Sequence, residues 1–146
     1  MKEITIELDG KKETFDLDLV SIPSPDDLEE INQGIQQQPG LYVWYSYLAE
    51  RLKIRVEELE KELENVAAKI ELRVRKTGIL GIRKVTDNTV KAAVISDKEY
   101  VEKQQELFAM KKQWIGLRSI ELSLRQRKDM LATLSANLRK NQENDY

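Results

Sequence analysis

A seven-residue repeat of large apolar side chains constrains this chain more than any other feature. The repeat is carried by Met110, Leu117, Leu124, Leu131 and Leu138. No proline interrupts the stretch from Ser96 to about Asn141. An apolar residue at every seventh position stays on one side of a helix that winds around a neighbour, so the repeat predicts a long helix packed lengthwise against a second one. Ser96 is expected to cap its first turn.

A second apolar stripe, in residues 41–76, supplies the expected partner helix. Its members are Leu41, Tyr45, Leu48, Leu52, Val56, Leu59, Leu63, Val66, Ile70 and Val74. Their mean step of about 3.7 residues is closer to an eleven-residue repeat than to a heptad, so the two helices cannot supercoil perfectly along their whole length. The predicted fold is mainly α: a long antiparallel helical hairpin with short connecting helices.

Two short helices are expected beside the long ones. The first runs from Pro25 to about Gln37 and ends at Pro39-Gly40, because proline cannot continue the hydrogen-bond ladder of a helix. The second runs from Thr89 to Ile95 and is expected to be capped by the stretch Thr86-Asp87-Asn88.

The first 22 residues follow a different pattern. Ile4, Ile6 and Leu8 alternate with polar residues, Asp9-Gly10 follows, and Phe15, Leu17 and Leu19 alternate again. This pattern predicts a β-hairpin appendage in residues 1–22, joined to a helical domain in residues 23–146. The outer face of the hairpin is expected to be acidic, through Glu3, Glu7, Glu13, Asp16 and Asp18. Because an isolated hairpin is marginally stable in water, it should pack on a helix or on a partner.

The composition excludes several classes of function. The sequence contains neither cysteine nor histidine, which removes thiol catalysis, the usual general base and the common zinc sites. We therefore expect no enzyme, no metal and no cofactor. There is no apolar run long enough to cross a membrane and no basic, apolar leader, which predicts a cytoplasmic protein without a membrane contact.

The net charge of −2 hides a strong segregation of charge. Residues 1–31 carry three basic and ten acidic residues, whereas residues 69–91 carry seven basic and two acidic residues. A local net charge of +5 predicts an anion-binding segment, although a solvated basic turn is the simpler alternative. The turn lacks the Gly-Lys-Ser/Thr ending of a nucleotide-binding loop, so nucleic-acid phosphates fit better than ATP.

The candidate nucleic-acid-binding residues fall into two sets. The first surrounds the turn and consists of Lys69, Arg73, Arg75, Lys76, Arg83, Lys84 and Lys91. The second is a ridge at seven-residue spacing on the last helix, with Arg118 and Arg125 at its centre and Lys111 and Arg139 at its ends. A solvated face mixed with acidic residues is an equally good explanation of the ridge.

A lone helical hairpin of this length exposes much of its apolar surface, so the chain is expected to form a homo-oligomer. The residues predicted to make the subunit contacts are Trp44, Leu48, Leu52, Leu59, Leu63, Trp114, Leu117, Leu124 and Leu131.

The stretch KVTDNTVKAAVISDKEY, followed by a long helix ending in QRKDMLATLSANLRK, resembles the UvsY-type family of phage recombination mediators. These small proteins load a RecA-like recombinase onto single-stranded DNA that is coated by a single-strand-binding protein. The resemblance is one of layout: an aromatic-led helix, a basic turn with glycine, a short capped helix and a long last helix. It covers about 100 of the 146 residues.

The resemblance implies a non-enzymatic mediator that binds single-stranded DNA and forms a ring of identical subunits. Its partners would be the recombinase and the single-strand-binding protein, in the host cytoplasm if a phage encodes it. The family's DNA contacts fall late in the first long helix. Lys69 matches such a position, whereas Glu71 replaces the next basic one, and Arg73, Arg75 and Lys76 are candidate substitutes.

Two other functions remain open at this point. The same apolar stripes suit a structural or assembly coiled-coil protein of a phage that makes no contact with DNA. The acidic hairpin, which has no counterpart in the mediator family, suits an inhibitor or decoy.

Overall fold

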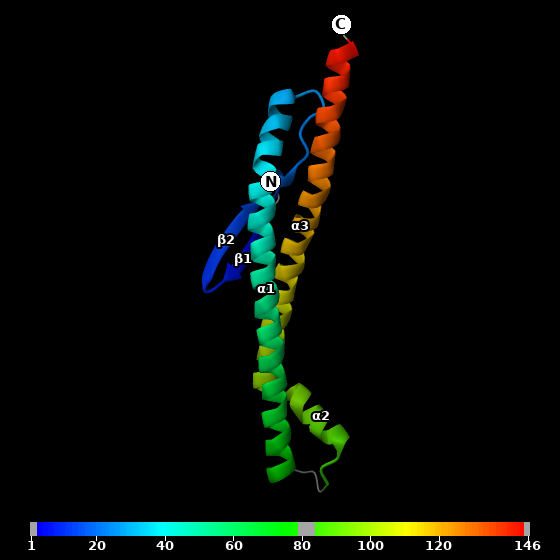
Figure 1. Ribbon diagram of the computed structural model, residues 1–146. Coiled ribbons are helices and arrows are strands. Elements are labelled where there is room, and N and C mark those ends of the chain that lie inside the picture. The colour runs from blue at the N-terminus through cyan, green and yellow to red at the C-terminus, as the bar shows by residue number, and fades with distance from the viewer. Residues whose placement is uncertain (1–2, 79–83, 145–146) are drawn as a thin grey trace. The chain divides into compact units, whose positions relative to one another are not determined.

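The computed structural model describes residues 3–78 and 84–144 (Figure 1). The elements are β1 (Glu3–Leu8), β2 (Lys11–Asp16), a 3-10 helix η1 (Leu17–Val20), α1 (Leu28–Thr77), α2 (Asp87–Ser96) and α3 (Lys98–Asn144). The predicted class is confirmed, since the structure is 81% helical and has one small antiparallel sheet. No helix in the described ranges is both long and apolar enough to cross a membrane.

The chain forms two compact units, which we describe separately. Unit 1 consists of Met1–Leu52 and Gln113–Tyr146, and unit 2 of Lys53–Lys112. Each unit therefore contains a part of α1 and a part of α3. The hairpin belongs to unit 1, together with the helical segments that it contacts.

In unit 1, α1 and α3 pack in antiparallel directions. A Cβ atom on Gly34 would meet Leu131, the Gln38 side chain reaches the Leu124 carbonyl, and Tyr42 contacts Arg125. The core between the helices comprises Ile31, Tyr45, Leu48, Leu52, Leu117, Ile120, Leu124 and Leu131, each at most 4% exposed. The predicted leucine repeat thus forms a helix–helix core, as expected.

The hairpin packs on unit 1. Its turn residues Asp9 and Gly10 have φ angles of 52° and 75°, as a two-residue type I′ turn requires. Ile6 is 1% exposed, and the Phe15 ring meets the Tyr45 ring edge-on at 5.4 Å between centroids. The backbone N–H of Glu7 donates a hydrogen bond to the side chain of Gln113 at 2.9 Å. The expectation that the hairpin needs a helix beneath it is confirmed.

The register of the sheet corrects the predicted acidic face. Glu13 pairs with Ile6, and residues that pair directly share a face, so Glu13 lies on the face of Ile6 rather than beside Glu3 and Glu7. The second strand also ends earlier than its alternation suggests. Asp16 caps η1 by accepting a hydrogen bond from the backbone N–H of Asp18 at 2.9 Å, which places Asp18 outside the strand.

The predicted break at Pro39-Gly40 is wrong, because α1 continues through both residues. An internal proline costs a helix about 3 kcal/mol, since it lacks an N–H group and crowds the preceding turn. Here the helix is packed on α3 on both sides of the proline, with Ile31 at 0% and Tyr45 at 1% exposure. Burial of this kind contributes about 1.5–3 kcal/mol for each large side chain, which offsets the local cost.

In unit 2, α2 rests against the last turns of α1. Val66, Ile70 and Val74 of α1 form a buried cluster with Val90 of α2. The first turn of α2 is closed by a reciprocal capping box between Thr86 and Thr89, so the predicted cap at Thr86 is confirmed.

Asp97, rather than the predicted Ser96, caps α3. The Asp97 Oδ1 atom accepts hydrogen bonds from the backbone N–H groups of Glu99 and Tyr100, at 2.9 and 3.4 Å. Ser96 still belongs to α2, and its hydroxyl donates to the carbonyl of Ala92 at 2.8 Å. The extended backbone of Asp97, with φ −65° and ψ 133°, separates the two helices and is the conformation that a cap needs.

Candidate nucleic-acid interfaces

Basic side chains gather at the end of unit 2 where α2 meets α1. Residues 69–78 and 84–97 carry six basic and three acidic residues, a net charge of +3. The basic residues of this group, which we call the basic end, are Lys69, Arg73, Arg75, Lys76, Lys84 and Lys91. The apolar cluster around Val90 holds α2 to α1 and so keeps the two parts of the group together (Figure 1). The predicted site residue Arg83 lies outside the described residues.

The two arginines of the basic end form ion pairs that link α1 to α2 and to the start of α3. Arg73 Nη2 lies 2.9 Å from Asp97 Oδ2, while Arg75 Nη2 lies 2.7 Å from Asp87 Oδ1 and Arg75 Nε lies 3.1 Å from Glu71 Oε1. Hydrogen bonds from Arg73 and Arg75 hold the pKa values of Asp97 and Asp87, respectively, below their usual range. The arginines are therefore already neutralised in large part, and an anion would have to compete with these carboxylates.

The four lysines of the basic end are differently placed. Lys69, Lys76, Lys84 and Lys91 are exposed, and no carboxylate of residues 3–78 or 84–144 forms an ion pair with them. Their charges are thus available to a ligand, and they carry the anion-binding potential of this end.

The lowered aspartate pKa values predict how stability depends on pH. A carboxyl group whose pKa is lowered on folding stabilises the fold fully above its unfolded pKa, about 3.9, and loses this contribution as the pH falls through the folded value. Thermal melting followed by circular dichroism should therefore show a constant contribution from these pairs between about pH 7 and 5 and a loss below about pH 4. The double variant Asp87→Asn/Asp97→Asn should lose less stability on acidification than the wild type. Equal losses would show that the pairs do not stabilise the fold.

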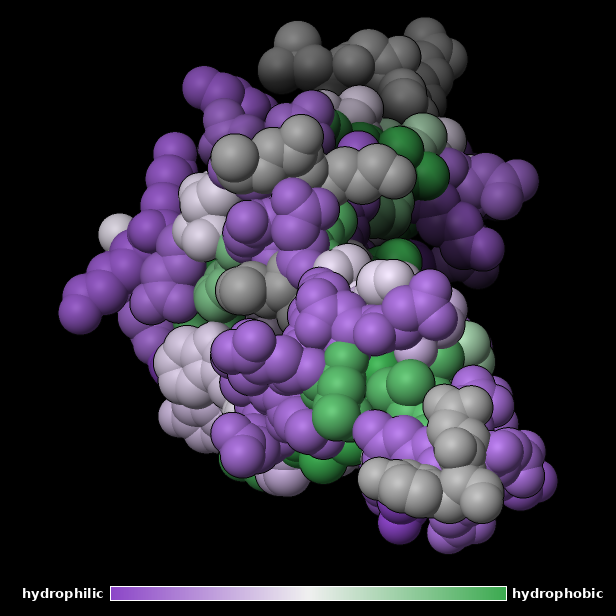
Figure 2. Space-filling model, turned by 90° about the horizontal axis from the view of Figure 1, so that it is seen from above, coloured by the Kyte–Doolittle hydropathy of each residue, from purple (hydrophilic) through white to green (hydrophobic). Residues whose placement is uncertain are grey.

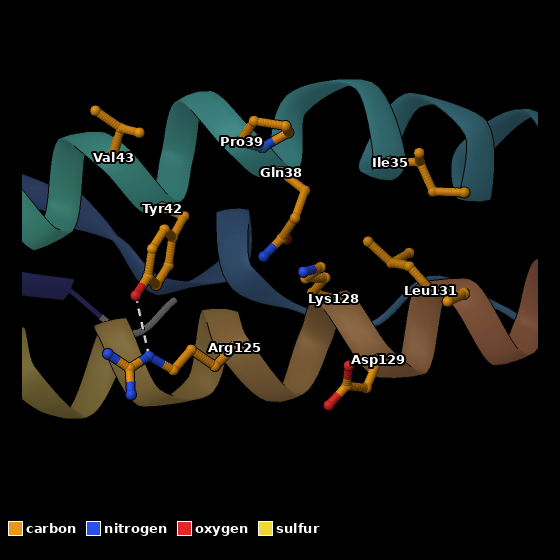
Figure 3. Close-up of a pocket in the computed structure, with 10 residues that line it drawn as sticks. Ile35, Gln38, Pro39, Tyr42, Val43, Arg125, Lys128, Asp129 and Leu131 are labelled. Carbon is orange, nitrogen blue, oxygen red and sulfur yellow. Dashed lines mark hydrogen bonds between the residues drawn. The ribbon is translucent and has the colours of Figure 1, made fainter.

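The predicted ridge on α3 is broken up by local partners. Lys111 forms an ion pair with Glu60 at 3.3 Å, within unit 2. In unit 1, Arg125 donates from Nε to the Tyr42 hydroxyl at 3.0 Å and pairs with Glu121 at 3.1 Å (Figure 3). The hydrogen bond to Tyr42 is the main reason why the pKa of Arg125 is raised.

Arg118 and Arg139 are the ridge residues that are exposed and have no ion-pair partner among the described residues. The guanidinium carbon of Arg118 lies 5.8 Å from the centroid of the Trp114 ring. An arginine stacked on an indole is a contact that can also receive a nucleobase or a phosphate. The ridge is therefore a weaker candidate than the basic end, because it has two available cations in place of four.

Arg127 lies on α3 two residues after Arg125 and has a structural role. It is only 6% exposed, and burial lowers its pKa. Its Nε atom donates to the carbonyl of Ser21 at 3.0 Å and its Nη1 atom to the side-chain oxygen of Gln38 at 2.8 Å. Its burial could have been predicted from its spacing in the sequence. Arg127 lies three residues after Leu124 and four before Leu131, which places it on the buried side of α3.

Most residues predicted to contact other subunits are covered within the single chain. Leu48, Leu52, Leu59, Leu117, Leu124 and Leu131 are at most 3% exposed. Leu63 and Trp114 are half-buried, and Trp44 is 46% exposed. The leucines therefore build the chain's own core, which leaves Trp44 as the most accessible member of the set.

In the part of the chain that the structure covers, no group of three or more carboxylates is placed to hold a metal ion. Comparison with protein-family models, curated proteins and solved structures found no match to this chain. The candidate interface consists of exposed cations on a helical scaffold.

Proposed function

We propose that this protein binds single-stranded nucleic acid without catalysing a reaction, and that the basic end of unit 2 is its interface. The observation that carries the proposal is the set of four exposed lysines, Lys69, Lys76, Lys84 and Lys91, which have no ion-pair partner among the described residues. Lysines of this kind bind backbone phosphates and release counterions, which needs no particular base sequence.

The resemblance to UvsY-type proteins narrows the proposal to a recombination mediator. Such a protein would bind single-stranded DNA as a homo-oligomer and help a RecA-like recombinase to replace a single-strand-binding protein. Several copies of one basic end on a single strand would raise the affinity by multivalency. The narrower function rests on the resemblance of residues 84–140, and the nucleic-acid interface rests on the lysines.

The test is fluorescence anisotropy of labelled oligothymidine over a series of salt concentrations. The wild type should bind at about 50 mM salt and weaken steeply as salt is added. Replacing the four lysines with alanine should reduce the affinity at least tenfold. It should also flatten the plot of log K against log salt, by about 0.7 for each phosphate contact that is lost.

A matched control separates the site from the general effect of charge. Lys53, Lys61, Lys112 and Lys140 are also exposed, and replacing them with alanine removes the same total charge. This control should keep the wild-type salt dependence. If both variants lose affinity equally, the binding is non-specific and the basic end is not the interface.

The mediator step has its own readout. Recombinase assembly on DNA that is coated with single-strand-binding protein starts after a lag, and a mediator should shorten this lag at sub-saturating recombinase. If the wild type binds DNA but leaves the lag unchanged, nucleic-acid binding is supported and the mediator function is contradicted.

The assembly-protein alternative is favoured by one specific observation, an exposed apolar groove in unit 1 that is described below. An assembly protein of this kind would self-associate but fail to bind oligothymidine at about 50 mM salt. The same titration therefore decides between the two functions.

A further inference from the structure

An apolar groove runs between α1 and α3 in unit 1 (Figure 3). Its volume is about 710 Å³. The lining residues from α1 are Ile35, Gln38, Pro39, Tyr42 and Val43, and those from α3 are Arg125, Lys128, Asp129, Leu131 and Ala132. Figure 2 shows apolar side chains gathered between hydrophilic ones at the end where α1 begins and α3 ends. Large apolar surface is exposed here, with Ile35 at 40% and Val43 at 65% exposure.

The α1 segment that lines one side of the groove carries no charged residue on any face. From Ile31 to Ala49, 19 consecutive residues include no Asp, Glu, Lys or Arg. At the chain's average of 34% charged residues, a segment of this length would carry about six. Charged residues are depleted at the cores of protein interfaces, because burying them is costly. The buried side of the segment faces α3 and the hairpin. Its outer side is also uncharged, which indicates that a further partner binds there.

The charges on the α3 wall indicate which partner fits. Arg125, Lys128 and Asp129 line the groove. Glu121 lies beside it and pairs with Arg125 at 3.1 Å, so this part of α3 carries two charges of each sign. A strongly acidic partner would be repelled by the two carboxylates, and a strongly basic one by the two cations. A second copy of the same surface carries the same balanced set, and uncharged α1 segments can approach each other without repulsion. Association of two identical patches is also the commonest symmetry of soluble oligomers.

We propose that a second copy of this chain covers the groove, so that the α1 segment Ile31–Ala49 of each copy packs against that of the other. The contact centres on the apolar residues Ile35, Pro39 and Val43. These differ from the leucines that the sequence alone assigned to subunit contacts. The inference does not depend on nucleic-acid binding, because the four lysines of the basic end belong to unit 2.

The first test is sedimentation velocity over a range of protein concentrations. The wild type should show a species of about 34 kDa, twice the chain mass of 17.0 kDa. Ile35→Glu should shift this equilibrium to the monomer, because it buries a charge that has no partner. Ile54→Glu is the matched control, since Ile54 is also an exposed isoleucine of α1, at 53%, but lies outside the groove. The control should remain a dimer, and circular dichroism should show that both variants are folded.

The second test uses the absence of cysteine from the chain. Single cysteines are placed at Ile35, at Val43 and, as the control, at Ile54. Each variant is oxidised under mild conditions and separated on a non-reducing gel. At least one groove position should form a covalent dimer at tenfold or more the rate of the control, since a disulfide requires Cα atoms within about 7 Å of each other.

Three results would overturn the proposal. One is a wild type that stays monomeric at all concentrations, which would leave the groove to a different protein or to a small molecule. Another is an oligomer that Ile35→Glu leaves intact, which would place the subunit contact elsewhere. The third is cross-linking at Ile54 that equals cross-linking at the groove positions.

Discussion

Replacing Leu124 with alanine is expected to lower the free energy of unfolding by about 3 kcal/mol. Leu124 is 0% exposed and lies at the centre of the leucine repeat, where α3 meets α1 in unit 1. The substitution removes three buried carbon atoms and leaves a cavity that two long helices cannot easily close. Denaturant unfolding followed by circular dichroism measures the loss. In a thermal scan, the midpoint should fall by roughly 10 °C for a chain of this length.

The control lies two residues away on the same helix. Leu122 is 48% exposed, and its replacement by alanine leaves helix propensity almost unchanged, so the free energy of unfolding should change by less than about 0.5 kcal/mol. If both variants lost the same stability, the seven-residue repeat would not mark the core. The experiment therefore tests the sequence pattern from which the fold was predicted.

That pattern predicted much of the fold because it is local. Apolar residues at helical spacing identified both long helices, and strict alternation around Asp9-Gly10 identified the hairpin and its turn. In each case the spacing of a few neighbours fixes which side of the element is apolar. The packing of α1 on α3 could then be predicted as well, because the apolar stripe of one helix is buried against the apolar stripe of the other.

The errors arose where a distant contact outweighed a local preference. Pro39 is a strong local stop signal, but α1 passes through it because residues on both sides are packed on α3, more than 80 positions away in the sequence. At the start of α3, Ser96 and Asp97 are both good capping residues. The choice between them depended on where α2 ends, and one-residue boundaries of this kind are rarely visible in a sequence.

The candidate site was also predicted only in part. The excess of basic residues around the turn was visible in the sequence, but the distinction between its arginines and its lysines was not. Arg73 meets Asp97 across 24 positions, and Arg75 meets Asp87 across 12. These partners are brought together by the docking of α2 on α1, so only the structure shows that the lysines retain available charges.

Replacing Gln38 with leucine is expected to destabilise the protein by about 2 kcal/mol, although leucine is similar in volume and more apolar. The side-chain oxygen of Gln38 accepts a hydrogen bond from Arg127 Nη1 at 2.8 Å, and both residues are 6% exposed. The variant leaves a buried guanidinium with one acceptor fewer. Because no carboxylate among the described residues pairs with Arg127, the lost hydrogen bond is not replaced by an ion pair.

A double-mutant cycle isolates this interaction from the effect of changing either side chain alone. Arg127→Met by itself leaves the Gln38 oxygen and the Ser21 carbonyl without their donor. The double variant Gln38→Leu/Arg127→Met removes the buried cation and its acceptor together. It should therefore be more stable than the sum of the single losses predicts, by at least about 1 kcal/mol. Additive losses would mean that the two residues do not interact in solution. In that case Gln38 would hold α1 on α3 only through its hydrogen bond to the Leu124 carbonyl.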